Sequence, residues 1–222
     1  MIKLTLTLAA LTIAASSANA AILFSQNFDA ETPALNSGLA QFTVAGQVDT
    51  VASGTFGITC PGNCVDLDGT SGPGAITSTP IFFLAGRPVI VSFDLSGNQR
   101  DGNIDEFVAQ VFFKPANGGT AGFISGPASF DPGYLNMLNG TPYVEGIVGT
   151  RPFLTYSYTF TAVTSGSFQL YFGTTSGDNV GPILDNVLVT GSVPEPATWG
   201  LMIAGFGMVG FAARRRRTAV AA

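Results

Sequence analysis

VIVSFDL, residues 89–95, alternates apolar and polar side chains with a period of two. A second stretch, LTYSYTF at residues 154–160, repeats the pattern, with Thr and Ser between its apolar residues. Phe168, Leu170 and Phe172 continue the same period. Such alternation is typical of strands with one buried side and one side facing solvent. These three stretches therefore predict an all-β fold.

Apolar segments of this kind recur about every ten residues between clusters of Gly, Pro, Asn and Asp. They predict further strands at residues 22–28, 39–45, 54–59, 75–83, 106–113 and 183–190. Residues 118–149 are less regular, and we expect a long loop or two weak strands there. No long stretch shows the period of an amphipathic helix. Short strands with frequent turns favour a single antiparallel β-sandwich, jelly-roll-like, over residues 21–192.

The N-terminus contains the three parts of a secretory signal peptide in their usual order. Lys3 precedes an apolar stretch over residues 4–15, and Ala18-Asn19-Ala20 supplies the small-residue cleavage site. The apolar stretch is too short to span a bilayer as a helix. We therefore expect signal peptidase to remove residues 1–20 by cutting after Ala20, which leaves the domain outside the cytoplasm.

The C-terminus, residues 193–222, has the composition of a short membrane segment. Residues 199–213 are uncharged, and as a helix they would be roughly 22 Å long, against a hydrocarbon core of about 30 Å. Four glycines weaken this helix, and the arginine cluster 214–217 would remain cytoplasmic by the positive-inside rule. We expect a short transmembrane helix that anchors the chain temporarily.

Four features follow one another in this segment: Pro194, Glu195 and Pro196, then Trp199, then a glycine-rich apolar run, and then Arg214, Arg215, Arg216 and Arg217. Together they resemble the PEP-CTERM sorting signal in its P-E-P-x-x-W variant (motif 194–199), although Gly200 replaces the usual Ala. The resemblance implies that an exosortase, a membrane-embedded enzyme similar to cysteine transpeptidases, cuts near Pro-Glu-Pro. It also implies a Gram-negative bacterium that makes extracellular polysaccharide. The chain would be anchored in the inner membrane before processing, and would reach the cell surface or the exterior afterwards.

The expected domain is acidic. Residues 21–192 contain four basic residues and thirteen carboxylates, a formal charge of −9. Nucleic-acid binding needs a clustered basic surface, so this composition argues against a nucleic-acid partner. Solubility explains the acidity simply, and cation binding is the more specific alternative.

Four short motifs resemble galactose-binding-like and carbohydrate-binding jelly rolls: Asn27-Phe28-Asp29 and residues 65–69, 92–95 and 181–187. In those families the carboxylate of the last strand commonly holds a structural calcium together with groups near the first strand. The resemblance implies calcium ligands at Asp185 and Asp29. The alternative is that both residues cap turns at strand ends. Two carboxylates cannot by themselves supply the six to eight oxygens that calcium takes.

Asp66-Leu67-Asp68-Gly69 echoes part of a calcium-binding loop. Alternation places both carboxylates on one face, but the third acidic ligand and the distal Glu of an EF-hand loop are missing. We therefore expect a solvated strand end that runs into a glycine turn.

Cys60 and Cys64 are the only cysteines, and they frame Pro61-Gly62-Asn63. In an exported chain this pair predicts one disulfide that closes a tight loop. Zinc is disfavoured because the chain contains no His, and the spacing has one residue more than a redox C-x-x-C motif.

Because the chain contains no His, catalysis by a Ser-His-Asp triad or a Cys-His pair is excluded. A two-carboxylate glycosidase passes this filter, because residues 99–106 hold three acids, Asp101, Asp105 and Glu106, beside Arg100. Acids clustered in one loop are more often simply solvated, so we favour a protein without catalytic activity.

A sugar-binding role would need aromatic faces with planar polar groups beside them. We predict Asn98, Gln99 and Arg100 as donors and Tyr134 as a stacking residue, with Tyr143 and Tyr171 as further candidates. Three functions follow: a non-catalytic component of the cell surface or polysaccharide matrix, a carbohydrate-binding module stabilised by calcium, and a glycosidase. Structural calcium is the one cofactor, and extracellular polysaccharide the one ligand, that the sequence suggests.

Overall fold

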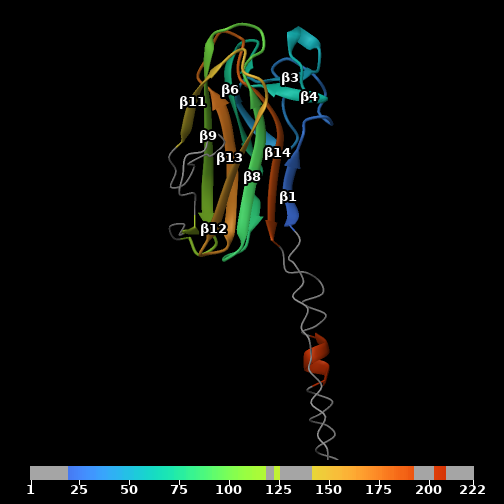
Figure 1. Ribbon diagram of the computed structural model, residues 1–222, viewed down its shortest axis with the longest axis vertical. Helices are drawn as coiled ribbons and strands as arrows, with labels where there is room; N and C mark the ends of the chain where they lie inside the picture. The colour runs from blue at the N-terminus through green and yellow to red at the C-terminus, as the bar shows by residue number, and fades with distance from the viewer. Residues whose placement is uncertain (1–19, 119–122, 126–141, 193–202, 209–222) are drawn as a thin grey trace, which may run out of the picture. The chain divides into compact units, whose positions relative to one another are not determined.

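The structure is a computed structural model, and it describes residues 20–118, 123–125, 142–192 and 203–208. Within residues 20–192, the described part folds into two antiparallel sheets that pack face to face as a sandwich (Figure 1). Residues 20–192 form one compact unit. The fold class predicted from the alternating stretches is confirmed. In chain order the strands are β1 (Ala20–Gln26), β2 (Phe42–Gly46), β3 (Asp49–Ala52), β4 (Asn63–Asp66), β5 (Asp68–Gly69), β6 (Gly72–Ser78), β7 (Ile81–Phe83), β8 (Pro88–Ser96), β9 (Ile104–Pro115), β10 (Phe123–Ser125), β11 (Tyr143–Val148), β12 (Leu154–Ala162), β13 (Gly166–Thr174) and β14 (Ile183–Ser192).

The first sheet has the strand order β10-β12-β8-β14-β4-β3, and β1 also pairs with β14. One side of β14 pairs with β8. Its other side pairs first with β4 and then with β1, whose Ala20 lies opposite Ser192. The first and last strands of the domain are therefore neighbours.

The second sheet has the strand order β11-β9-β13-β6-β2, and β7 extends it beside β13. The pair β9 and β13 is in register from Pro115 opposite Gly166 to Phe107 opposite Thr174. Strand β7 pairs with the beginning of β13, so Phe82 lies opposite Ser167. These three strands carry the surface described in the next section.

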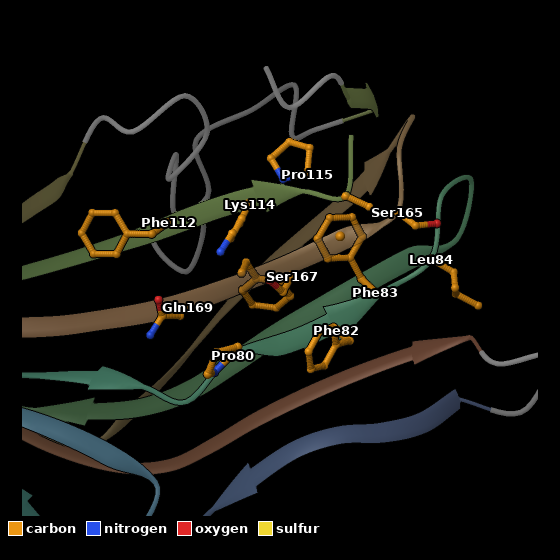
Figure 2. A pocket seen from close by; sticks show the side chains of 13 residues that line it. Pro80, Phe82, Phe83, Leu84, Phe112, Lys114, Pro115, Ser165, Ser167 and Gln169 are labelled. Atoms are coloured by element: carbon orange, nitrogen blue, oxygen red, sulfur yellow. The ribbon is translucent and has the colours of Figure 1, made fainter. Parts of the chain in front are cut away.

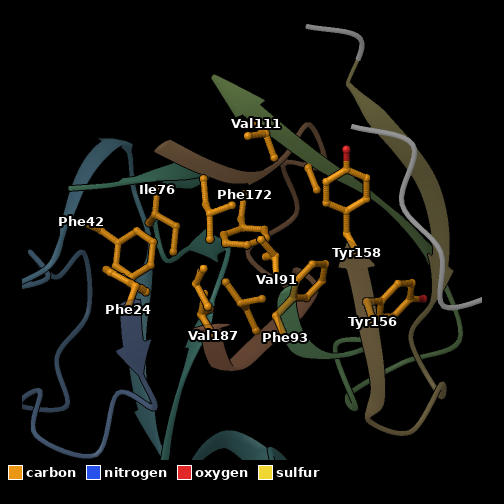
Figure 3. Packing of buried hydrophobic residues seen from close by; sticks show 14 of the residues in the cluster. Phe24, Phe42, Ile76, Val91, Phe93, Val111, Tyr156, Tyr158, Phe172 and Val187 are labelled. Atoms are coloured by element: carbon orange, nitrogen blue, oxygen red, sulfur yellow. The ribbon is translucent and has the colours of Figure 1, made fainter. Parts of the chain in front are cut away.

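The core lies between the two sheets and is rich in aromatic rings (Figure 3). In β8, residues 89, 91, 93 and 95 are all buried, as the alternation predicts. Phe93 stacks on Tyr156 with ring centroids 5.4 Å apart and meets Phe172 of the other sheet at 4.8 Å. Such contacts between rings stabilise a core beyond the burial of their area. The buried side chains thus hold the two sheets together.

Most of the predicted strands are found with small shifts at their ends. The stretch 75–83 is divided into β6 and β7 around Thr79-Pro80, because proline has no N–H to donate to a ladder. Residues 118–149 include the short strand β10 and the edge strand β11. Three short strands, β3, β4 and β5, were not predicted.

The strand predicted at 54–59 is wrong. Residues Thr55–Gly57 form a short 3-10 helix, and Gly54 and Gly57 have φ angles of 84° and 82°. These left-handed conformations are favourable for glycine and break an extended strand. Phe56 lies between them at φ 52° and is 57% exposed.

In the C-terminal unit, residues 203–208 are helical, inside the predicted apolar helix 199–213. Within the part of the chain that the structure describes, no helix has both the length and the apolar character that crossing a membrane requires.

Candidate functional site

A groove of about 620 Å³ lies on the outer face of the second sheet, over β7, β9 and β13 (Figure 2). Phe82 and Phe112 are its exposed rings, with 75% and 43% of their surface accessible. Lys114 and Gln169 supply polar groups beside these rings. A concave surface of this size, largely apolar with a few polar groups, has the usual composition of a ligand site.

The strand register arranges these side chains in rows across the sheet. Phe82, Ser167 and Lys114 form the first row, because Ser167 lies opposite the other two on its two neighbouring strands. Gln169 lies opposite Phe112 in the next row. Side chains two residues apart in a strand share one face, so both rows lie on the same face of the sheet. Each row places an aromatic ring beside polar groups: hydroxyl and ammonium in the first, amide in the second.

Tyr171, one of the tyrosines predicted to stack on a ligand, does not line the groove but lies beside Phe112. The rings of Phe112 and Tyr171 lie edge to face at 6.0 Å. Gln169 donates its side-chain N–H to the Ser78 carbonyl oxygen at 2.8 Å, which fixes the amide on the surface. The groove is therefore built on rigid strands. Sequence reasoning missed Phe82 and Phe112, because phenylalanine in an alternating strand is most often buried.

A second, more polar pocket of about 370 Å³ lies on the outer face of the first sheet. The β-bulge in β14 after Asp185 forms its wall, and Asn186 adopts φ 50° there. Asn186 donates its side-chain N–H to Asp94 Oδ2 at 2.9 Å. The bulge turns this amide toward the pocket and places the preceding carboxyl group inside the sandwich.

Asp185 is fully buried. Its Oδ1 accepts the Asn186 backbone N–H at 2.7 Å, whereas its Oδ2 has no hydrogen-bond partner. Burial raises the pKa of Asp185 to about 7, and repulsion from Asp29 and Asp94 adds to the effect. A buried carboxylate oxygen without a partner has the character expected of a cation ligand.

The second calcium candidate, Asp29, has a different environment. Its Oδ1 accepts the Asn63 backbone N–H at 2.9 Å, and its Oδ2 accepts the Asn27 side-chain N–H at 2.7 Å. Among the described residues, no three acidic, Cys or His side chains are grouped so that they could hold a metal ion. Of the two predicted ligands, Asp185 is the one with an oxygen left for calcium, and the predicted calcium site remains a prediction.

The predicted ligand donors Asn98, Gln99 and Arg100 make internal contacts. Asn98 is fully buried and donates to Asp101 Oδ1 at 2.9 Å and to Asp105 Oδ2 at 2.8 Å. The Gln99 amide donates to the Thr59 carbonyl oxygen and accepts the Thr59 N–H.

Arg100 forms an ion pair with Asp66, whose side chain is only 2% exposed. The contacts of these three donors hold loops together, so we place the candidate ligand surface on the groove instead.

Asp66 and Asp68 lie at strand ends before a glycine turn, as expected, but the expectation that they are solvated is wrong, because both are buried. Asp66 Oδ1 accepts the backbone N–H groups of Asp68 and Gly181, each at 3.0 Å. Asp68 Oδ2 accepts those of Asp178 and Asn179 at 2.9 and 3.0 Å. The two carboxylates bind the loop before β14 to the β4–β5 segment. Desolvation raises the pKa of Asp66 to about 7 although Arg100 opposes the shift.

Of the three candidate glycosidase acids, Asp101 and Asp105 share the Asn98 amide as a donor, and burial raises the pKa of Asp105. Asp101 accepts hydrogen bonds from Asn98 and Asn103, and these contacts lower its pKa. Glu106 accepts the Thr175 hydroxyl at 2.7 Å. A catalytic acid needs a raised pKa, so Asp101 is poorly suited to that role.

A further polar cluster was not foreseen from the sequence. Arg151 donates to Glu145 at 2.6 Å and lies over the ring of buried Tyr156, 5.4 Å from its centroid. The hydroxyls of Tyr143 and Tyr156 donate to Glu145 at 2.7 and 3.0 Å. Burial is the main cause that raises the pKa of both tyrosines, and the Glu145 carboxylate adds to it. Both hydroxyls therefore stay protonated and act as donors. The Tyr143 hydroxyl is therefore engaged in a hydrogen bond within the protein.

The predicted disulfide between Cys60 and Cys64 is present. Both residues are buried beside Val51, Ile58 and Ile183 in a small satellite core. The remaining predicted site residues lie outside the described residues: Ala18, Tyr134, Pro194, Glu195, Pro196, Trp199, Arg214, Arg215, Arg216 and Arg217.

Residues 20–192 thus define an antiparallel β-sandwich with a surface groove. Residues 192–217 match a known sequence family, the PEP-CTERM protein-sorting motif. The chain therefore carries the signal that its C-terminal residues resemble. This motif indicates export, membrane anchoring before processing, and an exosortase as the processing partner. No curated protein matches the sequence.

Solved structures with a similar fold include several carbohydrate-binding modules. One is the CBM22-1 xylan-binding domain from Paenibacillus barcinonensis Xyn10C, with 14% identity, TM-score 0.45, and coverage of 81% of this chain and 100% of the module. Another is the C-terminal family 22 carbohydrate-binding module of Clostridium thermocellum Xyn10B, with 12% identity, TM-score 0.43, and coverage of 78% and 94%. The C-terminal CBM6 of LamC from Zobellia galactanivorans has 12% identity, TM-score 0.39, and coverage of 68% and 93%.

Proposed function

We propose that the protein is a non-catalytic component of the cell surface or extracellular polysaccharide matrix of a Gram-negative bacterium. The PEP-CTERM motif at residues 192–217 is the observation that carries this proposal. Signal peptidase would remove the N-terminal segment, and exosortase would then cut near Pro194-Glu195-Pro196 and free the sandwich from the inner membrane. The chain contains no His, so the usual histidine general base is absent, and this supports a role without catalysis.

Intact mass and C-terminal peptide mapping, by cell fraction, test this proposal. We expect the protein in the surface or culture fraction to begin near Ala21, to end near residues 194–196, and to lack Arg214–Arg217. A full-length chain that stays in the membrane at steady state would identify the segment as a permanent anchor and contradict the proposal.

A second candidate is carbohydrate binding by the same domain. The observation that favours it is the groove over β7, β9 and β13, where Phe82 and Phe112 alternate with Ser167, Lys114 and Gln169. Aromatic rings can cover the apolar faces of sugar rings, while amide, hydroxyl and ammonium groups bind their oxygens. The rigid strands keep the ordering cost of such binding low.

A glycan array with the processed protein, with and without a calcium chelator, tests this second function. We expect binding that Phe112→Ala weakens and that the chelator leaves in place, because the groove does not include Asp185 or Asp29. Absence of binding to every glycan would leave the matrix role without direct sugar recognition.

A further inference from the structure

We propose that the groove over β7, β9 and β13 binds an acidic polysaccharide, with Lys114 pairing to its anionic groups. This inference rests on the carbohydrate-binding function proposed above and names the class of ligand. It comes from the distribution of charge in the domain.

The groove lies at one end of the sandwich, which the strand register defines. Pro115 and Phe83 both lie opposite Gly166, and Thr161 lies opposite Pro88. The described segments that meet here are 20–22, 79–90, 110–118, 123–125, 159–169 and 189–192. They contain Arg87 and Lys114 and no carboxylate. All twelve carboxylates in the described part of residues 21–192 lie in other segments.

The two other cations of the domain are neutralised elsewhere. Arg100 pairs with Asp66, and Arg151 pairs with Glu145. No Asp or Glu among the described residues lines the groove, so a carboxylate on a ligand would meet the Lys114 ammonium without a competitor from that part of the chain. A domain with a formal charge of −9 repels polyanions over most of its surface. An acidic chain is therefore directed to this end.

The row of Phe82, Ser167 and Lys114 indicates how such a ligand would lie. Neighbouring strands are about 4.8 Å apart, so the ring and the ammonium group, two strands apart, are separated by roughly 10 Å at the backbone. One sugar ring can rest on Phe82 while an acidic group of the same chain reaches Lys114. Ser167 between them offers a hydroxyl, and Phe112 in the next row covers a neighbouring sugar.

The test measures binding of the processed protein to polygalacturonate, by titration calorimetry at low salt. The matched neutral ligand is the same polymer after its carboxyl groups have been reduced. We expect the protein to bind the acidic polymer, and added salt to weaken this binding. The reduced polymer should bind at least about tenfold more weakly, because a charge-assisted hydrogen bond is lost. Lys114→Gln should cause a similar loss for the acidic polymer alone, and Lys114→Arg should retain most of the binding.

Arg87→Gln is the control variant, since it removes the same charge at the same end from a residue that does not line the groove. We expect it to weaken binding clearly less than Lys114→Gln does, because Arg87 lies outside the groove lining and cannot hydrogen-bond a ligand group there. Phe82→Ala should weaken binding of both polymers. Because Phe82 is largely exposed and Lys114 is exposed, these variants should unfold at the wild-type midpoint.

The possible contradictions are distinct. Equal affinity for the acidic and the reduced polymer would overturn the ionic inference and leave carbohydrate binding in place. Unchanged affinity in Lys114→Gln would place the anionic site elsewhere. Binding to neither polymer, or only to phosphatidylglycerol vesicles, would overturn both sugar proposals. Export and processing stay separately measurable by C-terminal mapping of the same sample.

Discussion

Asp185 has its carboxyl group inside the sandwich, with one oxygen that accepts no hydrogen bond. The pKa of Asp185 is about 7 in the folded protein, against the ordinary value of 3.8 that applies in the unfolded chain. At pH values between these two pKa values, Asp185 keeps its proton in the folded protein and has lost it in the unfolded chain. The contribution of Asp185 to stability is therefore complete below about pH 4 and is lost as the pH rises toward about 7.

We expect the free energy of unfolding of calcium-free protein to decrease between about pH 4 and pH 8, and Asp185→Asn to remove part of that decrease. The neutral amide avoids the cost of a buried charge, so the variant should be more stable than wild type near pH 8 by roughly 2 kcal/mol. Urea unfolding across this pH range measures both effects.

Asp94→Asn serves as the comparison, because Asp94 lies opposite Asp185 in the β8–β14 pair, its oxygens accept hydrogen bonds from Asn186 and Thr155, and its charge is the smallest of the causes that shift the pKa of Asp185. If Asp185→Asn is less stable at every pH, the buried carboxyl has another partner. A rise in stability on adding calcium, lost in Asp185→Asn, would assign that partner to the metal.

At the scale of elements, the loops at one end of the sandwich pack tightly against each other. Gly97 follows β8, and a Cβ atom there would lie 2.2 Å from the Val148 carbonyl oxygen and 2.4 Å from that of Gly149. We expect Gly97→Ala to lower the free energy of unfolding by about 2 kcal/mol or more, because backbone must move to admit the methyl group.

Gly102 in the same loop is the matched control, since a Cβ atom at that position would meet no other atom within 4 Å. We expect Gly102→Ala to change the free energy of unfolding by less than about 1 kcal/mol. Equal effects of the two substitutions in denaturant unfolding would contradict the packing seen around Gly97.

The disulfide is the second element to test. It closes a loop with a sequence separation of four, and Asp29 binds that loop through the Asn63 N–H. A ring this small restricts the unfolded chain only slightly, so the double variant Cys60→Ser/Cys64→Ser should lose about 2 kcal/mol. Thermal unfolding of oxidised, reduced and double-variant protein measures the loss. A reduced protein that fails to fold would show that the disulfide supports more than its own loop.

The sequence predicted the strands that alternate cleanly, because a strand with one buried face imposes that pattern on its residues. It failed at residues 54–59, where Gly54 and Gly57 turn the chain. It also failed at Asp66 and Asp68, because their burial depends on N–H groups of residues 178–181, more than a hundred positions away. The groove was not predicted for the same reason: its side chains come together only through the register of three strands, β7, β13 and β9.

At the scale of the whole molecule, the sorting motif and the domain are separate parts of one chain. We expect the triple variant Pro194→Ala/Glu195→Ala/Pro196→Ala to accumulate at full length in the membrane fraction, because the exosortase would no longer cut it. Immunoblotting of membrane and culture fractions measures this. Thr198→Ala, inside the segment but at an unspecified position of P-E-P-x-x-W, should be processed normally. Normal release of the triple variant would contradict processing at this motif.

The position of β14 has a mechanical consequence. This strand ends at Ser192, directly before the sorting motif, and it pairs with β8 along one side and with β4 and β1 along the other. A pull on the C-terminal attachment along the strand would load the hydrogen bonds of both sides at once in shear, instead of opening them one after another as at a sheet edge. Until the chain is cut, the domain is thus attached to its membrane segment through a strand well suited to bear tension.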